Sequence, residues 1–340
     1  MTSRRHFTTG LAAALACLPF GLRGRLFADE QAETGRLAPK MVRAGADPWT
    51  IEYKGRYYSS QSNNPTRSIR LWVSDAPDEA GEFKTIWTAP RRGPYSREIW
   101  APEIHFVDGR FFVYFAADDG ENRNHRTYVL VSENDDPFSN YTLEGPIYTG
   151  DDFENKTENR WAIDATLFEH KDQRYLIWSG WKDDRDIQYL YIAPMERFPV
   201  QTSGPRVLIC DNADYLWERV EEREGTRGLA EGPEILRSPN GRIFLTYSCG
   251  ASWLPTYKVG ILELIGDDPL DPKSWKKYPE PFFQSDEFQF GVGHGSFPVD
   301  KDGQTLFLYH AKRSREPGWP RDVFVRYLDF DADGFPVVRY

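Results

Sequence analysis

Four carboxylates and one imidazole recur at similar places along this 340-residue chain. Each lies six to ten residues before the second residue of a short turn, near the expected start of a β-strand: Asp47, Glu103, Asp164, Glu231 and His294. Acidic side chains are seldom buried together unless they share a task. Two carboxyl groups flanking a glycosidic bond can hydrolyse it: one protonates the leaving oxygen, and the other activates water or attacks directly. The five residues therefore predict a hydrolytic site, provided that the fold brings them together.

The turns that follow these residues predict the elements that position them. The five turns are Lys54-Gly55, Asp108-Gly109, Lys171-Asp172, Asn240-Gly241 and Asp302-Gly303. Asp-Gly and Asn-Gly favour hairpin turns, and the bulky residues after each turn favour strands. The copies are spaced widely enough for a four-stranded antiparallel sheet and its loops. Five such sheets most simply bury their faces by packing radially.

The sequence therefore predicts an all-β, single-domain, five-bladed β-propeller over residues 41–340. We expect the blades at about 41–99, 100–160, 161–226, 227–290 and 291–340. The last blade is short, so we expect the N-terminal segment to help close the ring. The first strand of each blade is innermost in a propeller, so the five polar residues should form one ring, in register, at one mouth of the central channel.

The geometry of the blades predicts a different catalytic role for each carboxylate. For a ring radius of roughly 4–5 Å, Asp47 and Glu231 lie about 8–9 Å apart, within the ~6.5–9.5 Å of inverting enzymes. Asp164 neighbours Glu231, and its charge should raise the pKa of Glu231 and keep this residue protonated as an acid. Glu234 follows Glu231 by three positions, so strand alternation predicts that it points to the other face.

Five motifs resemble glycoside hydrolase family 43, in the order of that family: Ala46-Asp47-Pro48, Trp100-Ala101-Pro102-Glu103-Ile104-His105, Ile163-Asp164-Ala165-Thr166, Glu231-Gly232-Pro233 and Gly291-Val292-Gly293-His294. The resemblance runs from about Ala46 to the C-terminus. It implies a five-bladed propeller and an inverting mechanism. It also implies that Asp47 is the general base, Asp164 the residue that orients and modulates the pKa, and Glu231 the general acid.

Four further residues are candidates for substrate binding. Trp100 opens the second blade and could floor the sugar subsite, whereas Glu103 is either a substrate contact or a structural hydrogen-bond acceptor. His294 could contact the sugar or hold water around a structural ion in the channel, as in enzymes that this chain resembles. Arg321 could bind sugar hydroxyls, and His105 and His310 are expected to be structural. No cofactor is required by this chemistry, and no spacing predicts a zinc site.

The predicted function is that of an exo-acting α-L-arabinofuranosidase acting on arabinan or on oligosaccharides that carry arabinose. The alternatives are a β-xylosidase, an endo-arabinanase, a galactofuranosidase, or a non-catalytic propeller that binds carbohydrate. The chain departs from the family pattern at Ala46, where many members have His, at Gly295, where related arabinofuranosidases often have Asn, and at Arg321-Asp322-Val323, in place of Arg-x-Thr. These changes affect the pocket wall and hence the identity of the sugar.

Charge and the first residues limit the partners and the location. The net charge of −10 argues against binding to nucleic acid or to anionic membranes, and no apolar run is long enough to span a membrane. Arg4-Arg5 before an apolar run predicts a twin-arginine export signal over residues 1–28, typical of bacteria, followed by a linker over 29–40. We therefore expect a periplasmic or extracellular protein, in which Cys210 and Cys249 are buried free thiols rather than a disulfide.

Overall fold

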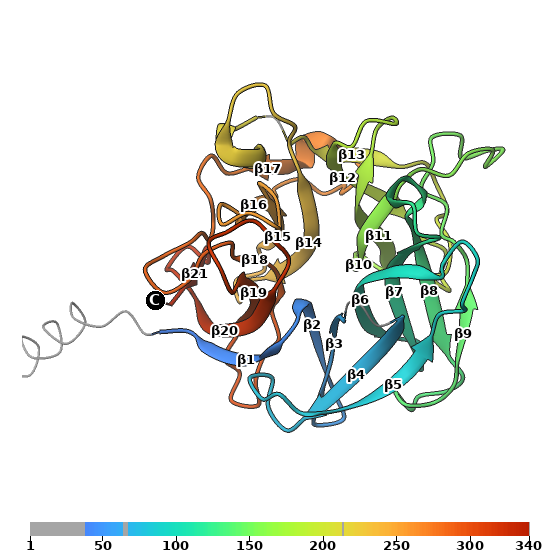
Figure 1. Ribbon diagram of the computed structural model, residues 1–340, viewed down its shortest axis with the longest axis horizontal. Helices are drawn as coiled ribbons and strands as arrows, with labels where there is room; N and C mark the ends of the chain where they lie inside the picture. The colour runs from blue at the N-terminus through green and yellow to red at the C-terminus, as the bar shows by residue number, and fades with distance from the viewer. Residues whose placement is uncertain (1–37, 64–66, 213, 340) are drawn as a thin grey trace, which may run out of the picture. The chain divides into compact units, whose positions relative to one another are not determined.

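A computed structural model describes residues 38–63, 67–212 and 214–339. In this part of the chain, five antiparallel sheets surround a common axis (Figure 1). The innermost strands are β2 (Ala46–Tyr53), β6 (Arg97–Val107), β10 (Ala162–His170), β14 (Ala230–Arg237) and β18 (Gly293–Ser296). Each of these strands contacts the next one around the axis, and β18 contacts β2. The predicted five-bladed β-propeller is confirmed.

The first four blades are four-stranded sheets whose strands follow one another in sequence order. Outside the inner strands they contain β3 (Arg56–Ser62), β4 (Ser68–Ser74) and β5 (Glu82–Thr88); β7 (Arg110–Asp118), β8 (Arg126–Ser132) and β9 (Tyr141–Glu144); β11 (Gln173–Trp181), β12 (Gln188–Pro194) and β13 (Val207–Cys210); and β15 (Ile243–Cys249), β16 (Lys258–Leu264) and β17 (Trp275–Lys277). All five predicted turns connect the first and second strands of a blade. We call the end of the axis where the inner strands begin the mouth end; these turns lie at the opposite end, the turn end.

The fifth blade is completed by the N-terminal segment, as predicted. Its sheet has the order β1 (Lys40–Ala44), β20 (Arg321–Phe330), β19 (Leu306–Lys312) and β18, and β21 (Pro336–Val338) pairs with β20. In β1, Lys40 pairs with Val325 and Ala44 pairs with Asp322. This pairing ties the start of the described chain to its last blade, so the ring is closed by backbone hydrogen bonds.

Bulky side chains fill the space between adjacent blades. One cluster of buried residues joins blades 2 and 3 and includes Tyr114 and Trp178, both completely buried. Another joins blades 3 and 4 and includes Tyr247. Cys210 and Cys249 belong to this second cluster as buried, free thiols, as expected from the sequence. Aromatic residues make up 15% of the chain. In these clusters they pack between the sheets, which holds the inner strands in fixed positions.

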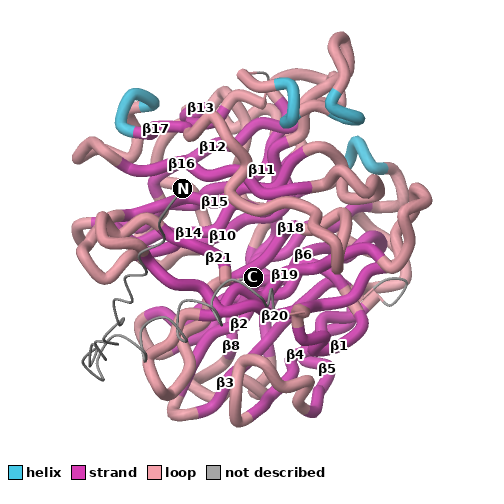
Figure 2. Tube along the Cα trace, turned by 90° about the vertical axis from the view of Figure 1, so that its left-hand side faces the viewer, coloured by secondary structure: helices cyan, strands magenta, loops and turns pink. Residues whose placement is uncertain are grey.

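Helix is limited to single turns in the described residues, and they lie at the periphery (Figure 2). These 3₁₀ turns are Asn122–Asn124, Leu216–Glu218, Val220–Glu222 and Pro272–Ser274. None of the helices in the described residues has the length and apolar character needed to cross a bilayer. The predicted export signal, and most of the predicted linker, lie outside the described residues.

Candidate active site

Every inner strand carries a β-bulge near its first residues. Two residues of the inner strand oppose one residue of the second strand within the intervals Ala46–Trp49, Trp100–Glu103, Ile163–Thr166, Glu231–Glu234 and Gly293–Ser296. The first extra residue of each bulge has a positive φ: 58° at Asp47, 40° at Ala101, 53° at Asp164, 54° at Gly232 and 44° at His294. Such a recurrent irregularity redirects side chains, and bulges are common beside active sites.

The prediction that the five polar residues are in register is wrong, because they do not all occupy the same position of their bulge. Asp47, Asp164 and His294 occupy the equivalent bulge position, but Glu231 precedes it by one residue and Glu103 follows it by two. The number of residues between each polar residue and its hairpin turn could not predict these offsets, because the extra residue of the bulge does not change the pattern of bulky residues in the sequence. Contacts of His294 with Asp47 and Asp164, and the interaction of the Glu231 charge with both carboxyl groups, nevertheless place these four residues together at the mouth end.

The backbone N–H group of the bulge residue bonds to a side chain of the preceding blade in four blades. Asp47 N donates to His310 Nδ1 (3.2 Å), Ala101 N to Ser62 Oγ (2.8 Å), Gly232 N to Asp164 Oδ2 (3.1 Å) and His294 N to Ser248 Oγ (2.7 Å). A buried N–H without a partner would be costly, so these bonds stabilise the bulges. They also fix each catalytic candidate relative to its neighbouring blade.

Positively charged and hydrogen-bonding groups surround Asp47. His310 Nδ1 lies 3.2 Å from Asp47 Oδ1, His294 Nδ1 lies 3.3 Å from it, and the Arg321 guanidinium lies 3.5 Å from it. Burial favours protonation of Asp47, but interactions of the carboxylate with His294, Arg321 and His310 outweigh it and hold the pKa well below its usual value. Burial lowers the pKa of His294 itself, so the lasting positive charge beside Asp47 is that of Arg321. Asp47 is thus ionised at neutral pH, as a general base must be.

Glu231 has the opposite tendency. Burial raises its pKa, and this rise is moderated by a hydrogen bond from the Tyr257 hydroxyl to Glu231 Oε1 (2.8 Å). Negative charge on Asp47 adds to the increase, whereas Arg321 and a hydrogen bond from Gln188 oppose it. A carboxyl group with a raised pKa that faces an ionised carboxylate is suited to donate a proton.

Asp164 interacts with the charges of both Glu231 and Asp47. Its Oδ2 accepts the Gly232 N–H and lies 3.8 Å from His294 Nδ1. Burial raises its pKa well above the usual value, and charge on Glu231 and then on Asp47 raises it further. Because this coupling is reciprocal, Asp164 and Glu231 titrate as a pair. Whichever of the two carboxyl groups loses its proton second does so beside a carboxylate that is already charged, which makes that loss harder.

The coupling predicts the effect of Asp164→Asn on the pH profile of kcat/KM. The alkaline limb should move to lower pH, because the last proton then leaves Glu231 without a charged neighbour at position 164. The acidic limb should move little, because the groups that hold the pKa of Asp47 low, chiefly His294 and Arg321, are unchanged in this variant. Asn is the substitution of choice since it tolerates the φ of 53° at this position. An alkaline limb that stays in place would contradict the assigned coupling.

Gly232 is required by the way His294 packs. A Cβ atom added at Gly232 would lie 2.8 Å from Cγ of the His294 ring, and the residue has a φ of 54°. Glycine therefore allows His294 to lie against the backbone of the neighbouring blade while contacting Asp47 and Asp164. The Glu231-Gly232 pair in the sequence thus has a structural reason.

Glu103 and Glu234 lie together in a second layer, two residues beyond the bulge position. The Glu103 carboxyl group hydrogen-bonds to Thr166 and Glu234, and both glutamates are buried. The prediction that Glu234 points to the other face is wrong, because the extra residue of the bulge restores it to the side of Glu231. Of the two roles considered for Glu103, this placement favours the structural one.

This carboxyl pair predicts how stability depends on pH. Burial raises the pKa of both groups well above the usual value, and the pair must share a proton to keep its hydrogen bond. Stability from the pair is therefore present at low pH and lost as pH rises through the raised pKa values, at up to about 1.4 kcal/mol per pH unit for one proton.

In Glu234→Gln, an amide donor replaces the shared proton, so the free energy of unfolding should fall less between pH 5 and pH 8 than in the wild type. Chemical denaturation at both pH values measures it, with the exposed Glu144→Gln as control. An identical pH dependence in Glu234→Gln and wild type would show that the pair holds no additional proton.

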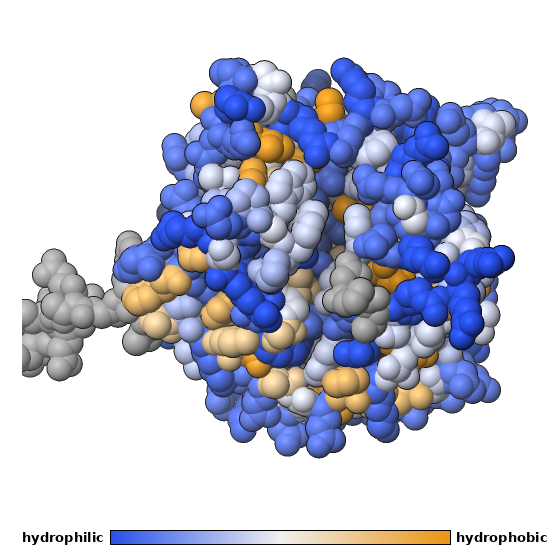
Figure 3. Space-filling view, in the orientation of Figure 1, coloured by the Kyte–Doolittle hydropathy of each residue, from blue (hydrophilic) through white to orange (hydrophobic). Residues whose placement is uncertain are grey.

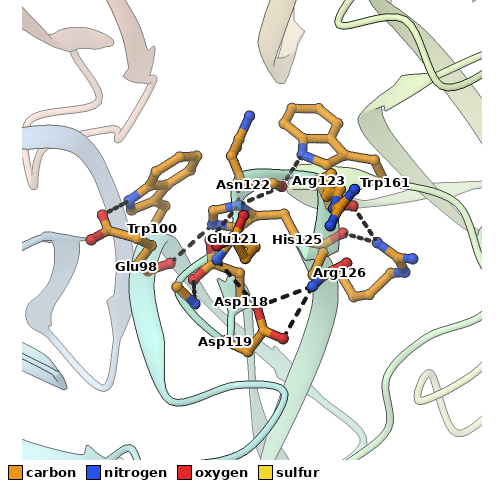
Figure 4. A network of polar contacts seen from close by, with 12 residues as sticks. Glu98, Trp100, Asp118, Asp119, Glu121, Asn122, Arg123, His125, Arg126 and Trp161 are labelled. Atoms are coloured by element: carbon orange, nitrogen blue, oxygen red, sulfur yellow. Dashed lines mark hydrogen bonds and ion pairs between the residues drawn. The ribbon is translucent and has the colours of Figure 1, made fainter.

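Trp100 is held rigidly at the mouth end of blade 2. Its indole N–H donates to Glu98 Oε2 (3.0 Å), and its ring stacks on His125 with centroids 3.9 Å apart (Figure 4). His125 is itself fixed, 3.2 Å from Asp118 Oδ2 and 3.2 Å from the Glu98 carbonyl oxygen. Burial lowers the pKa of His125 to about 4, so this support is a neutral ring at neutral pH. The half-buried Trp100 ring is thus preorganised.

His310 and Tyr257 belong to the site although the sequence did not predict them there. His310 contacts Asp47, Tyr257 hydrogen-bonds to Glu231, and their rings stack with centroids 5.5 Å apart. The sequence repeat did contain a signal that could have placed His310 at the site. Ser62, Ser179, Ser248 and His310 each follow the second residue of their hairpin turn by seven positions, so His310 replaces a repeated serine. Arg321 was predicted as a sugar ligand and does lie at the site.

The space-filling view shows that the face seen in Figure 1 is mainly hydrophilic, with apolar residues in small patches (Figure 3). A separate depression of about 570 Å³ lies at the turn end, lined by charged residues that include Asp108, Glu169 and Arg174. Arg174 pairs there with both carboxylates. These groups neutralise one another at the surface, so the depression offers no counterpart to the buried carboxyl groups of the mouth end.

The described residues contain no group of three or more His, Cys, Asp or Glu side chains arranged to hold a metal ion. The ion near His294, held through water, stays a prediction. Acid–base chemistry by paired carboxyl groups has no step that uses such an ion.

A five-bladed propeller with three buried carboxyl groups at one end of its axis is suited to hydrolysis of glycosidic bonds. The chain matches the family model described as glycosyl hydrolases family 43 over residues 39–336. It therefore belongs to glycosyl hydrolases family 43 and is a glycoside hydrolase.

Relatives of known activity extend this comparison. The chain is 33% identical to the extracellular exo-α-(1→5)-L-arabinofuranosidase of Streptomyces chartreusis over 287 residues, covering 81% of this chain and 82% of the relative. It is 31% identical to a protein of the same name from Streptomyces avermitilis, covering 96% of this chain and 68% of the relative. The crystal structure of an α-L-arabinofuranosidase from Lactobacillus brevis has a TM-score of 0.77 and 30% identity, covering 87% of this chain and 94% of that one.

Proposed function

We propose that this protein is an inverting, exo-acting α-L-arabinofuranosidase that releases terminal arabinofuranose from arabinan or from arabinose-containing oligosaccharides. The observation that carries the chemistry is the opposite pKa shift of Asp47 and Glu231 within one buried cluster. The names of the relatives from Streptomyces support the choice of sugar.

In this proposal Asp47 removes a proton from water, which attacks the anomeric carbon. Glu231 gives its proton to the glycosidic oxygen as the bond to the leaving sugar breaks. A single displacement inverts the anomeric configuration, and it needs enough space for water between base and sugar. The predicted separation of about 8–9 Å between Asp47 and Glu231 would provide that space.

Substrate contacts are proposed for residues that border the cluster. Arg321 and His294 contact Asp47, so they are placed to hydrogen-bond hydroxyl groups of a sugar bound beside it. The rigid Trp100 ring would support one face of the sugar. For Glu103 we propose a structural role, through its hydrogen bonds to Thr166 and Glu234 in the second layer.

Export is proposed on independent grounds. The twin arginines Arg4-Arg5 precede an apolar run, and two relatives are named extracellular. A structural ion near His294, held through water, is also proposed. Its presence could be measured by elemental analysis of the purified protein.

A substrate panel tests the proposed activity. It would include arabinan, α-(1→5)-linked arabino-oligosaccharides, arabinoxylan, and nitrophenyl glycosides of α-L-arabinofuranose, β-D-xylopyranose and β-D-galactofuranose. Arabinose should be the first and only small product from arabinan. Longer oligosaccharides as first products would indicate an endo-arabinanase, release of xylose or galactose would reassign the sugar, and binding without hydrolysis would indicate a non-catalytic propeller.

A further inference from the structure

Two tryptophans outside the cluster lie on loops at the mouth end. Trp253 belongs to loop 250–257 between β15 and β16, and Trp319 belongs to loop 313–320 between β19 and β20. Cys249, which precedes the first loop, pairs with Ala230, the neighbour of Glu231. Both loops therefore start at the level of the catalytic candidates, on blades 4 and 5.

The loops hold the two rings together. The Gly318 N–H donates to the Trp253 carbonyl oxygen (2.9 Å), and Lys312 Nζ donates to the Gly318 carbonyl oxygen. The Trp253 and Trp319 rings have centroids 5.5 Å apart at an interplanar angle of 55°. Trp319 is 61% exposed, more than any other large hydrophobic side chain among the described residues. A fixed yet exposed indole is typical of a binding surface.

Charged residues connect this pair of rings to both catalytic groups. The Arg321 guanidinium lies 5.9 Å from the Trp319 ring centroid and also contacts Asp47. The Arg227 guanidinium lies 5.9 Å from the Trp253 ring centroid, and its charge interacts with that of Glu231. The two tryptophans thus border the cluster on the side of blades 4 and 5, whereas Trp100 borders it on blade 2.

We propose that Trp253 and Trp319 form a platform for the sugar on the leaving-group side of the scissile bond, an inference that rests on the proposed function. The leaving sugar must lie next to the acid that protonates its oxygen, and Trp253 is on the acid's blade. The C–H groups on one face of a furanose ring match the electron-rich face of an indole. The platform's ligand is therefore the second residue of a neutral arabinofuranosyl oligosaccharide.

The test compares two substrates that share the terminal sugar but differ in the leaving group. They are α-(1→5)-L-arabinobiose, whose leaving group is a sugar, and methyl α-L-arabinofuranoside, whose leaving group is too small to reach the platform. The readout is the ratio of kcat/KM for the two. Trp319→Ala should lower this ratio about 3- to 10-fold, the size of one aromatic contact. Trp319→Phe should restore part of it.

Phe198→Ala is the matched control, because Phe198 is an aromatic residue that is 46% exposed and lies at the turn end. Its ratio should equal that of the wild type. An unchanged ratio in Trp319→Ala would overturn the platform, including the case in which both rates fall equally. Failure of the wild-type protein to release arabinose from either substrate would instead overturn the proposed function, and the platform with it.

Discussion

Asp47→Asn should lower kcat by about 10²–10⁴-fold, the usual contribution of a general base. The substitution keeps the shape of the side chain but removes the negatively charged carboxylate that would accept a proton from water. Asn also tolerates the φ of 58° at this position, so the bulge should form as before. Steady-state hydrolysis of arabino-oligosaccharides measures the effect, and circular dichroism verifies the fold.

Asp108→Asn is the control for this experiment. Asp108 is also a carboxylate paired with an arginine, but it lies at the turn end, where Arg174 Nη1 is 3.0 Å away. Its replacement should leave kcat unchanged. If Asp47→Asn retained most of the wild-type rate, Asp47 would not be the base, and the depressed pKa would have to be attributed to a structural ion pair.

Glu231→Gln should have an effect that depends on the leaving group. An arabinose leaving group needs a proton, so hydrolysis of arabinobiose should fall by about 10²–10⁴-fold. A nitrophenolate leaves without protonation, so hydrolysis of the nitrophenyl glycoside should fall much less. The amide oxygen of Gln can still accept the hydrogen bond from Tyr257, which limits rearrangement of the site.

The comparison is made on kcat/KM for both substrates, with Glu169→Gln as control. Glu169 is an exposed carboxylate that pairs with Arg174 at the turn end. Equal damage to both substrates in Glu231→Gln would mean that Glu231 does not act as the acid. Its hydrogen bond to Tyr257 would then be its principal role.

The architecture was accessible from the sequence because its signals are local. Each hairpin turn is specified by neighbouring residues such as Asp108-Gly109 and Asn240-Gly241, and each blade repeats the same order of elements. The short last blade implied that the N-terminal segment completes it, and β1 does so by pairing with β20. The convergence of Asp47, Asp164, Glu231 and His294 followed from the repeat alone.

The details of the site could not be predicted from the sequence, because they depend on the β-bulges, which the pattern of polar and bulky side chains does not indicate. A bulge adds one residue and reverses the strand alternation, so Glu234 lies on the side of Glu231 and Glu103 lies one layer deeper. His310 and Tyr257 were missed for a different reason. The role of His310 arises from a contact between blades 5 and 1, and Tyr257 bonds to Glu231 across blade 4, so neither contact can be predicted from the residues next to it in the sequence.

The central claim is that Asp47 and Glu231 cleave the bond in a single displacement. Proton NMR of the reaction in its first minutes, before mutarotation, identifies the anomer of the released arabinofuranose. With an α-linked substrate, the account predicts that the β-anomer appears first and the α-anomer follows by equilibration. Initial release of the α-anomer would show retention through a covalent intermediate and would contradict the assignment of Asp47 as a base that activates water.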